Sequence, residues 1–360
     1  MGIDAAAFAD LLTDYCLEVQ AGQEVLVRAT TLAEPLRLEC PRAILARDAW
    51  PLLRVELPGA TAAFHRHARD RHLDGFPEVS FAEAKKAHAH LGIQAPENTR
   101  ALVGIDPERL ARAARARKPL RDQTMRKRWC STLWPTQAGA QQAGMSFVDF
   151  EAFVTRALFL DQPDPKRSWG ELRAFQAGLI DRLKPARELR IEAPGTDVTL
   201  TVKGRTWVNS DGKRNMPSGE VFTGPHEASA NGRIRFGVPS SPAGVDVAGV
   251  DLEFRDGLVV AAAAERGDDY LQRALATDGG ARRLGELGIG TNFGIDRAIG
   301  ATLFDEKIGG TVHLALGRSY PETGGKNESA VHWDLICDLR SGGRLTADGE
   351  VVMQDGRFAL

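Results

Sequence analysis

The chain contains 360 residues, more than a typical single domain holds, which suggests two domains with a large core. Its composition, 43% hydrophobic and 26% charged, is ordinary for a globular protein and excludes a wholly disordered chain. The 46 Lys and Arg residues nearly balance the 48 Asp and Glu residues, so the net charge of −2 creates no global field that would attract nucleic acid or an anionic membrane. We therefore expect neither as a partner.

The N-terminal end of the sequence and its cysteines indicate where the protein works. The sequence begins with Met-Gly-Ile-Asp, without a basic n-region or a long apolar run, so we expect no signal peptide. The longest apolar stretch, residues 257–264, is far too short to span a bilayer. The four cysteines include no Cys-x-x-Cys pair, so neither a disulfide framework nor a cysteine-based zinc site is indicated. We predict a soluble cytoplasmic protein.

The first half of the chain alternates between helical and strand patterns. The predicted helices cover residues 5–19, a stretch reaching about residue 48, 107–117 and 169–183, and the predicted strands cover 24–28, 52–57, 100–105 and 129–134. Strands separated by helices predict an α/β domain with a mainly parallel sheet. Lys184 and Pro185 end the last helix, and there we place the boundary between residues 1–185 and a second domain, residues 186–360.

After residue 185 the hydrophobic pattern shifts toward a period of two. Strands are predicted at residues 198–202 and 233–237, with a hairpin that turns at Asp256 and Gly257. One helical insert is expected at about residues 268–284, and the glycine-rich run 288–294 is interpreted as a flexible turn. The second domain is therefore predicted to be a strand-rich α+β domain.

Four histidines of the first half form two His-x-His pairs in polar segments that are predicted to be helical. Side chains at positions i and i+2 of a helix diverge, so such pairs rarely chelate a metal ion. We therefore interpret them as surface histidines: His65, His67, His88 and His90.

Two further histidines lie in strand patterns near the C-terminal end. In residues 311–316, alternate apolar residues occupy one face and His313 the other. In residues 331–339, His332 and Asp334 project together from the face opposite Trp333, roughly 7 Å apart at the backbone. Such a pair is either a hydrogen-bonded structural pair or part of a metal site.

Carboxylates in glycine-rich sequence favour the metal site. Glu220 and Glu286 both lie in segments that we expect to form turns, where a carboxylate has little role in packing. A mixed set of histidine and carboxylate ligands suits hard or borderline divalent ions.

These residues resemble the thermophilic metallo-aminopeptidases of the aminopeptidase T and aminopeptidase S type. The resemblance covers residues 215–225, the segment around Glu286, and residues 303–340 almost without interruption. It implies two divalent metal ions per chain, with Zn, Co or Mn as the candidates, peptide substrates with a free N-terminus, and a homodimer. The metal ligands that it implies are Glu220, Glu286, His313, Tyr320, His332 and Asp334.

The resemblance also implies a mechanism. Two divalent ions, the three carboxylates of the ligand set and one bridging hydroxide sum to zero charge, and such ions lower the pKa of a shared water from about 16 toward neutrality. Glu306 is the candidate that carries a proton to the leaving amine, and the alternative is a loop carboxylate that pairs with Lys307. Tyr320 is expected to bind a metal ion or to stabilise the oxyanion, unless it is a packing residue before Pro321.

Two other function classes stay open at this point. A ring-cleaving dioxygenase of the pyridine-diol type, with one iron, would need only His313, His332 and Asp334. Glu220 and Glu286 disfavour it because that site has no use for them. A non-catalytic metal-binding protein is the third class, and the number of converging ligands disfavours it.

Overall fold

The computed structural model describes residues 2–359, which divide into two compact units. The first unit runs to Lys166 and includes Gly212–Pro217, and the second comprises Arg167–Asp211 and continues from Ser218. The helix α10 (Pro165–Leu183) thus lies mainly in the second unit, because Leu179 and Leu183 are buried in the core of that unit. The division into two domains at residue 185 stays a prediction. The two compact units differ from it because most of α10 belongs to the second unit and residues 212–217 belong to the first.

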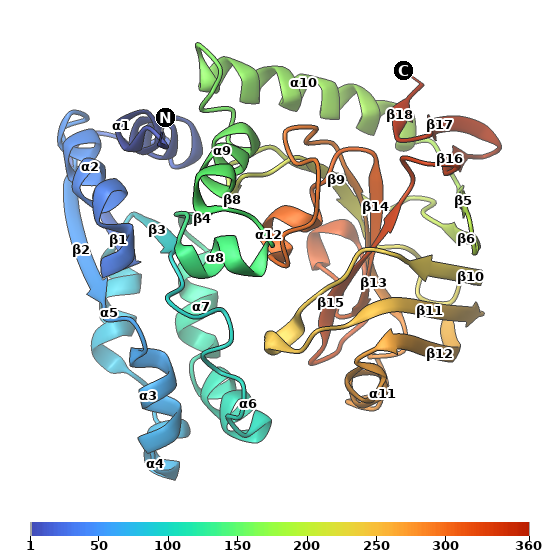
Figure 1. Ribbon diagram of the computed structural model, residues 1–360, viewed down its shortest axis with the longest axis horizontal. Helices are drawn as coiled ribbons and strands as arrows, with labels where there is room; N and C mark the ends of the chain where they lie inside the picture. Colours follow the sequence, from blue (N-terminus) through green and yellow to red (C-terminus); the bar gives the residue numbers. More distant parts are fainter. Residues whose placement is uncertain (1, 360) are drawn as a thin grey trace. The chain divides into compact units, whose positions relative to one another are not determined.

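The first unit is built on a five-stranded sheet in the order β2-β1-β3-β4-β8, in which every neighbouring pair is parallel. Its strands are β1 (Glu24–Thr30), β2 (Trp50–Glu56), β3 (Ala89–Gln94), β4 (Arg128–Leu133) and β8 (Asn215–Met216). Its helices are α1 (Ala5–Asp10), a π-helical turn at Leu11–Cys16, α2 (Glu34–Leu45), α3 (Ala60–His67), α4 (Asp70–Leu73), α5 (Glu78–Lys86), α6 (Pro107–Ala116), α7 (Lys118–Met125), α8 (Gln137–Gln142) and α9 (Phe147–Ala157) (Figure 1). The predicted α/β class with a parallel sheet is confirmed.

One predicted strand of this unit is wrong. Residues 100–105 form turns, and the strand between β1 and β4 is β3, to which the sequence pattern assigned a helix. His90 lies in β3 and is buried, so the interpretation of that residue as a surface histidine is also wrong. Its Nε2 lies 3.3 Å from the carbonyl oxygen of Ala84, and this partner allows a polar ring to be buried in a central strand.

The second unit contains two antiparallel sheets. The eight-stranded sheet has the order β12-β11-β10-β6-β5-β16-β17-β18, and the five-stranded sheet has the order β15-β14-β13-β9-β7 (Figure 1). The strands of the first are β5 (Glu188–Ala193), β6 (Thr196–Thr201), β10 (Asn231–Phe236), β11 (Ala248–Arg255), β12 (Leu258–Arg266), β16 (Arg344–Ala347), β17 (Glu350–Gln354) and β18 (Arg357–Phe358). Those of the second are β7 (Val208–Ser210), β9 (Glu220–Thr223), β13 (Leu284–Gly290), β14 (Thr311–Gly317) and β15 (His332–Asp338), and the helices are α10, α11 (Asp268–Leu275) and α12 (Thr302–Asp305).

Both sheets contribute to one apolar core. Ile191 and Leu252 enter it from the eight-stranded sheet, and Leu287, Leu314 and Leu335 enter it from the five-stranded sheet. Because side chains alternate along a strand, the residues between these apolar positions point to the other face of the five-stranded sheet. The expected strand-rich α+β unit is confirmed. Glu286, His313 and Asp334 directly precede the apolar residues of their strands and so belong to that other face.

The glycine-rich segments of this unit differ from their predicted turns. Glu286 lies within β13, all of whose residues are buried, and Glu220 is the first residue of β9. A Cβ atom on Gly288 would lie 2.0 Å from Cε1 of His313, and one on Gly290 would lie 2.0 Å from the carbonyl oxygen of Ile308. Glycine at these positions therefore makes room for neighbouring groups in a strand and does not mark a flexible turn.

Two other local predictions have different outcomes. The hairpin between β11 and β12 turns at Asp256 and Gly257, which both have positive φ values (48° and 75°) as expected. The helical insert ends at Leu275 instead of residue 284, because the Asp278 carboxylate accepts hydrogen bonds from the N–H groups of Gly280 and Ala281 and forms a turn there.

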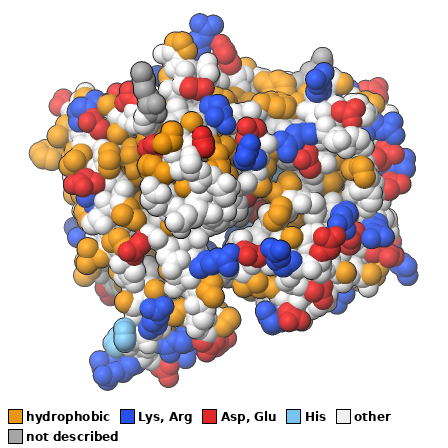
Figure 2. All heavy atoms as spheres, viewed as in Figure 1, with side chains coloured by type: hydrophobic (Ala, Val, Ile, Leu, Met, Phe, Trp, Pro, Cys, Tyr) orange, Lys and Arg blue, Asp and Glu red, His pale blue; other side chains and the backbone are white. Residues whose placement is uncertain are grey.

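Charges of both signs are interspersed on the face of the protein seen in Figure 2, in keeping with the net charge of −2. Among residues 2–359, no helix combines the length and the apolar character needed to cross a membrane.

Candidate metal centre

The polar face of the five-stranded sheet carries a cluster of ionisable side chains from four neighbouring strands. In the register of β13, β14 and β15, Glu286 lies opposite Ala315, and Ala315 lies opposite Asp334. The methyl group of Ala315 thus separates two carboxylates in one row and leaves space between them. Glu220 begins β9, where it pairs with Gly290 at the end of β13.

The first group of possible ligands centres on His313, which is fully buried. Its Nε2 atom lies 3.4 Å from Oε2 of Glu220 and 3.5 Å from Oε1 of Glu286. One atom from each of these residues lies within 4.8 Å of the others, close enough to bind a single ion.

The second group centres on His332. Its Nε2 atom lies 3.5 Å from Oε2 of Glu286 and 3.7 Å from Oδ1 of Asp334. Its Nδ1 atom lies 2.8 Å from the carbonyl oxygen of Arg318, which can only accept, so Nδ1 carries the proton. This hydrogen bond orients the ring and leaves the lone pair of Nε2 free for a metal ion. Glu286 belongs to both groups and directs one oxygen toward each histidine.

Two buried oxygens support a metal at this place. Oε2 of Glu220 and Oδ1 of Asp334 have no hydrogen-bond partner. A buried carboxylate oxygen that accepts no hydrogen bond costs free energy even beside a histidine, and a divalent cation bound between the two groups would remove that cost. Imidazole nitrogen and carboxylate oxygen are also ligands of Zn²⁺ and related ions, so these residues fit such an ion.

The electrostatics of the cluster follow from burial and from the number of carboxylates. Burial raises the pKa of Glu220 to about 7 and also raises the pKa values of Glu286 and Asp334. Burial alone would lower the pKa of His313, but the hydrogen bond to Glu286 and the charge of Glu220 outweigh it and raise the pKa to about 10. Without a metal ion, His313 therefore holds a proton that compensates part of the negative charge.

Lys307 is a member of the cluster that the sequence analysis considered only as a partner for Glu306. Its side chain has no exposed surface, and its Nζ atom lies 3.4 Å from Oε1 of Glu220 and forms an ion pair with Glu306. Burial would lower the pKa of Lys307, but the charges of Glu220 and Glu306 outweigh it and raise the pKa. The contact between Lys307 and Glu306 is the one that the loop-carboxylate alternative expects, and the role of Glu306 as a proton carrier stays a prediction.

Tyr320 lies beside the second group of ligands. Its ring contacts His332 and Phe222 edge-on, with centroid distances of 5.0 and 5.8 Å. Burial, together with the charge of Glu286, raises the pKa of Tyr320, so the phenol keeps its proton and can donate a hydrogen bond. Its assignment as a metal ligand stays a prediction.

Gln176 of α10 binds the backbone of Glu220, one of the possible ligands, and the sequence analysis did not identify it. Its buried Nε2 atom donates to the carbonyl oxygen of Glu220 at 2.8 Å and to the hydroxyl of Thr291 at 3.0 Å. The signal that could have revealed it is its position between Leu172 and Leu179, where a polar residue interrupts the apolar face of the helix.

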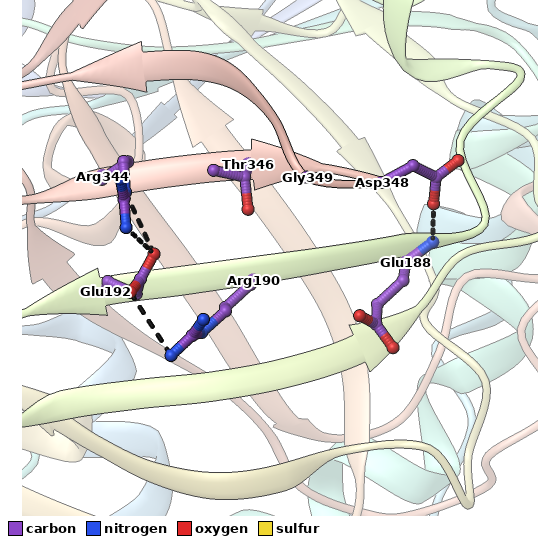
Figure 3. A pocket seen from close by; sticks show the side chains of 7 residues that line it. All are labelled: Glu188, Arg190, Glu192, Arg344, Thr346, Asp348 and Gly349. Carbon is purple, nitrogen blue, oxygen red and sulfur yellow. Dashed lines mark hydrogen bonds and ion pairs between the residues drawn. The ribbon is translucent and has the colours of Figure 1, made fainter.

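A separate surface depression of the second unit is lined by charged side chains that form ion pairs with one another (Figure 3). Arg344 and Arg190 both pair with Glu192, at 2.7 and 3.4 Å, and Asp348 accepts from the N–H of Glu188. These charges already have partners, and the depression lies on the eight-stranded sheet. The ionisable groups of the five-stranded sheet are therefore the candidate site.

The sequence of the chain is similar to those of known proteins over almost its whole length. The family model for thermophilic metalloproteases (M29) matches residues 4–358. The chain is 32% identical to Aminopeptidase 2 of Geobacillus stearothermophilus over 98% of this chain and 97% of that protein. It is 28% identical to Aminopeptidase T of Thermus aquaticus over 80% of this chain and 79% of that protein.

Two solved structures resemble the fold. AmpT of Thermus thermophilus superimposes with a TM-score of 0.86 at 26% identity, with 99% of each chain covered. A dioxygenase of Pseudomonas putida KT2440 that acts on 2,5-dihydroxypyridine reaches a TM-score of 0.60 at 14% identity, with 98% of this chain and 96% of that chain covered. The second likeness concerns the fold alone.

Proposed function

Because the chain belongs to the thermophilic metalloprotease family M29 and is a metal-dependent aminopeptidase, we propose that it holds two divalent ions that share Glu286. One ion would be bound by Glu220, Glu286 and His313, and the other by Glu286, His332 and Asp334. The observation that carries this proposal is that each oxygen of Glu286 faces a different histidine, at 3.5 Å in both cases. Tyr320 is proposed as a further ligand or as a donor to the substrate.

The two ions would supply an activated water and polarise the carbonyl group of the scissile bond. The residues around the ions would stabilise the developing negative charge and transfer the proton. The hydroxyl of Tyr320, which keeps its proton, would donate to the carbonyl oxygen as negative charge develops there. Glu306 would take the proton of the attacking water and pass it to the amine of the leaving peptide.

The free N-terminus of the substrate is proposed to bind at the same cluster. Four carboxylates and the proposed ions offer two ways to bind it: a free amine can bind a metal ion through its lone pair or donate to a carboxylate, whereas an acetylated nitrogen has no lone pair available and carries no charge. The four are Glu220, Glu286, Glu306 and Asp334. A peptide blocked at its N-terminus is therefore expected to be a poor substrate.

A homodimer is also proposed, and the edge strand β2 supports it. Trp50 and Val55 are 66% and 50% exposed, and Leu53 is exposed beside them. The N–H of Trp50 donates to the carbonyl oxygen of Gln23, the residue before β1, so the carbonyl of Pro51 and the backbone groups of Leu53 and Val55 point outward. A second copy could pair with this edge about a twofold axis. The cytoplasmic location stays a prediction.

The test of the metal proposal combines ion counting with activity. The purified protein is treated exhaustively with a chelator and then titrated with Zn²⁺, Co²⁺ or Mn²⁺, while hydrolysis of an aminoacyl p-nitroanilide is followed. We expect loss of activity, recovery with two ions per chain by mass spectrometry, and no cleavage of the N-acetylated substrate. Full activity in metal-free protein would contradict the proposal.

A further inference from the structure

We propose that Lys307 is a positioning residue, a fixed internal cation that restricts Glu220 to a single metal-binding oxygen and holds Glu306 away from the metal ions. This inference rests on the proposed two-metal site. Lys307 lies 3.4 Å from Oε1 of Glu220, whereas Oε2 of the same carboxylate faces Nε2 of His313 at 3.4 Å. The two oxygens of Glu220 thus have different partners, one a permanent cation and the other the ligand group.

The second contact of Lys307 has the same effect on Glu306. An ion pair joins Nζ to Oε1 of Glu306, whose side chain is only 14% exposed. Glu306 thus shares its cation with Glu220, a proposed metal ligand. Without that cation its carboxylate would be attracted to the proposed divalent ions and could become an additional ligand. A carboxylate that binds a metal ion cannot carry a proton, so Lys307 would keep Glu306 available for that task.

The backbone around Lys307 keeps its side chain in this place. Its N–H donates to the carbonyl oxygen of Phe304 at 3.0 Å, and its own carbonyl accepts from the N–H of Asn292 at 3.1 Å. Phe304 and Ile308, which flank this segment, are fully buried. A lysine is seldom buried so completely, and this one is tolerated because two carboxylates face it.

A merely structural ion pair makes a different prediction from this proposal. If Lys307 only stabilised the fold, its removal would loosen the site and weaken metal binding. If it positions the two glutamates by its charge, its removal leaves the site more negative, so divalent ions bind at least as tightly while proton transfer fails. When Lys307 loses its charge, turnover should therefore fall while metal affinity stays the same or increases.

The experiment uses Lys307→Met, which keeps most of the side-chain length and removes the charge. The full chain is loaded with Co²⁺, and its visible absorption spectrum, its affinity from competition with a chelator and its kcat are measured. We expect an affinity at least equal to that of the wild type, an altered spectrum from an additional oxygen ligand, and a fall in kcat of roughly 10² to 10⁴.

Two further variants make the result decisive. Lys307→Met combined with Glu306→Gln also removes the ligand that Glu306 could supply. Its spectrum should therefore differ less from that of the wild type than the spectrum of Lys307→Met does, with the remaining change due to Oε1 of Glu220, while kcat stays low. Lys213→Met is the matched control, because Lys213 contacts Glu18 at 2.9 Å in the first unit, and it should change none of the three quantities.

Weaker Co²⁺ binding with an unchanged spectrum in Lys307→Met would overturn the proposal. If that variant does not fold by circular dichroism, the double variant decides: a folded protein with an altered spectrum supports the positioning role, because Oε1 of Glu220 is then free to bind. A wild-type spectrum contradicts that role, and failure to fold shows that Lys307 is a structural residue. A wild-type protein that binds no Co²⁺ would instead contradict the proposed two-metal function, so the two failures are distinguishable.

Discussion

The ring of His313 occupies the space that a side chain at residue 288 would fill, and Gly288 leaves that space free. A Cβ atom at position 288 would lie 2.0 Å from Cε1 of the ring, far inside van der Waals contact. Gly288→Ala should therefore displace His313, destabilise the protein by about 1–3 kcal/mol and reduce metal content in one of the two groups. Thermal unfolding and mass spectrometry of the metal-loaded protein measure both effects.

The control for this substitution is Gly178→Ala. Gly178 lies in α10, and a Cβ atom there would meet no other atom within 4 Å. Alanine at an unstrained helical position stabilises a protein by about 0.4–1 kcal/mol, so this variant should keep its metal content and gain slightly in stability. Equal metal content in the two variants would show that His313 is not a ligand.

The protons held by the cluster predict how metal binding depends on pH. His313, with its pKa raised to about 10, must lose its proton before Nε2 can bind an ion, and Glu220, with its pKa raised to about 7, must also be ionised. Affinity should therefore rise with pH up to about 10, and more steeply below pH 7, where both groups lose a proton on binding.

Calorimetric titration with Zn²⁺ in two buffers of different ionisation enthalpy measures the protons released. About one proton per bound ion of the His313 group is expected at pH 8, and more at pH 6. An affinity that does not change between pH 6 and pH 9 would contradict the assignment of His313 as a ligand.

At the scale of an element, the edge strand β2 has exposed apolar side chains that no other part of residues 2–359 covers. Its apolar side chains and its outward backbone groups form an edge that would favour association. If two copies pair through this edge, Val55→Lys adds a positive charge to the paired edge of each copy and should shift the protein from dimer to monomer. Light scattering coupled to size-exclusion chromatography measures the change.

The matched control is Val79→Lys on α5. Val79 is 73% exposed in the same unit, so this variant adds the same charge at a comparable surface position. It should leave the association state unchanged. A Val55→Lys protein that stays dimeric would show that the dimer, if it forms, uses another surface.

At the scale of the whole molecule, the two compact units should respond differently to the metal. Every proposed ligand lies in the unit that continues from Ser218. Each ion present at about 100 times its dissociation constant adds about 2.7 kcal/mol to the stability of the unit that binds it, or roughly 5–10 °C in Tm, so two ions add about twice this amount. Calorimetry with and without a chelator should therefore show one transition that shifts by this amount.

The same measurement tests the predicted division of the chain into two domains. If the units unfold separately, the transition of the first unit should keep its temperature when the metal is removed. A single transition that shifts as a whole would show that the chain unfolds cooperatively, and a melting profile that does not respond to metal would contradict the proposed coupling of binding and stability.

The sequence by itself determined the features that depend on neighbours along the chain. The period of two in residues 311–316 and 331–339 identified β14 and β15 and the face that carries His313, His332 and Asp334, because side-chain direction alternates with every residue of a strand. The family followed from residues 215–225, the segment around Glu286 and residues 303–340, because each of these segments can be recognised from its own residues alone.

Only the tertiary structure decided which side chains meet. The register of β13 against β14 places Glu286 between the two histidines, 27 residues from His313 in the chain. Burial of Lys307 and the need for Gly288 depend on contacts with residues from other strands. Hydrophobic periodicity describes one element at a time, whereas these contacts depend on how separate elements pack. The glycines of β13 were therefore interpreted as a turn, although they make room for residues of neighbouring segments.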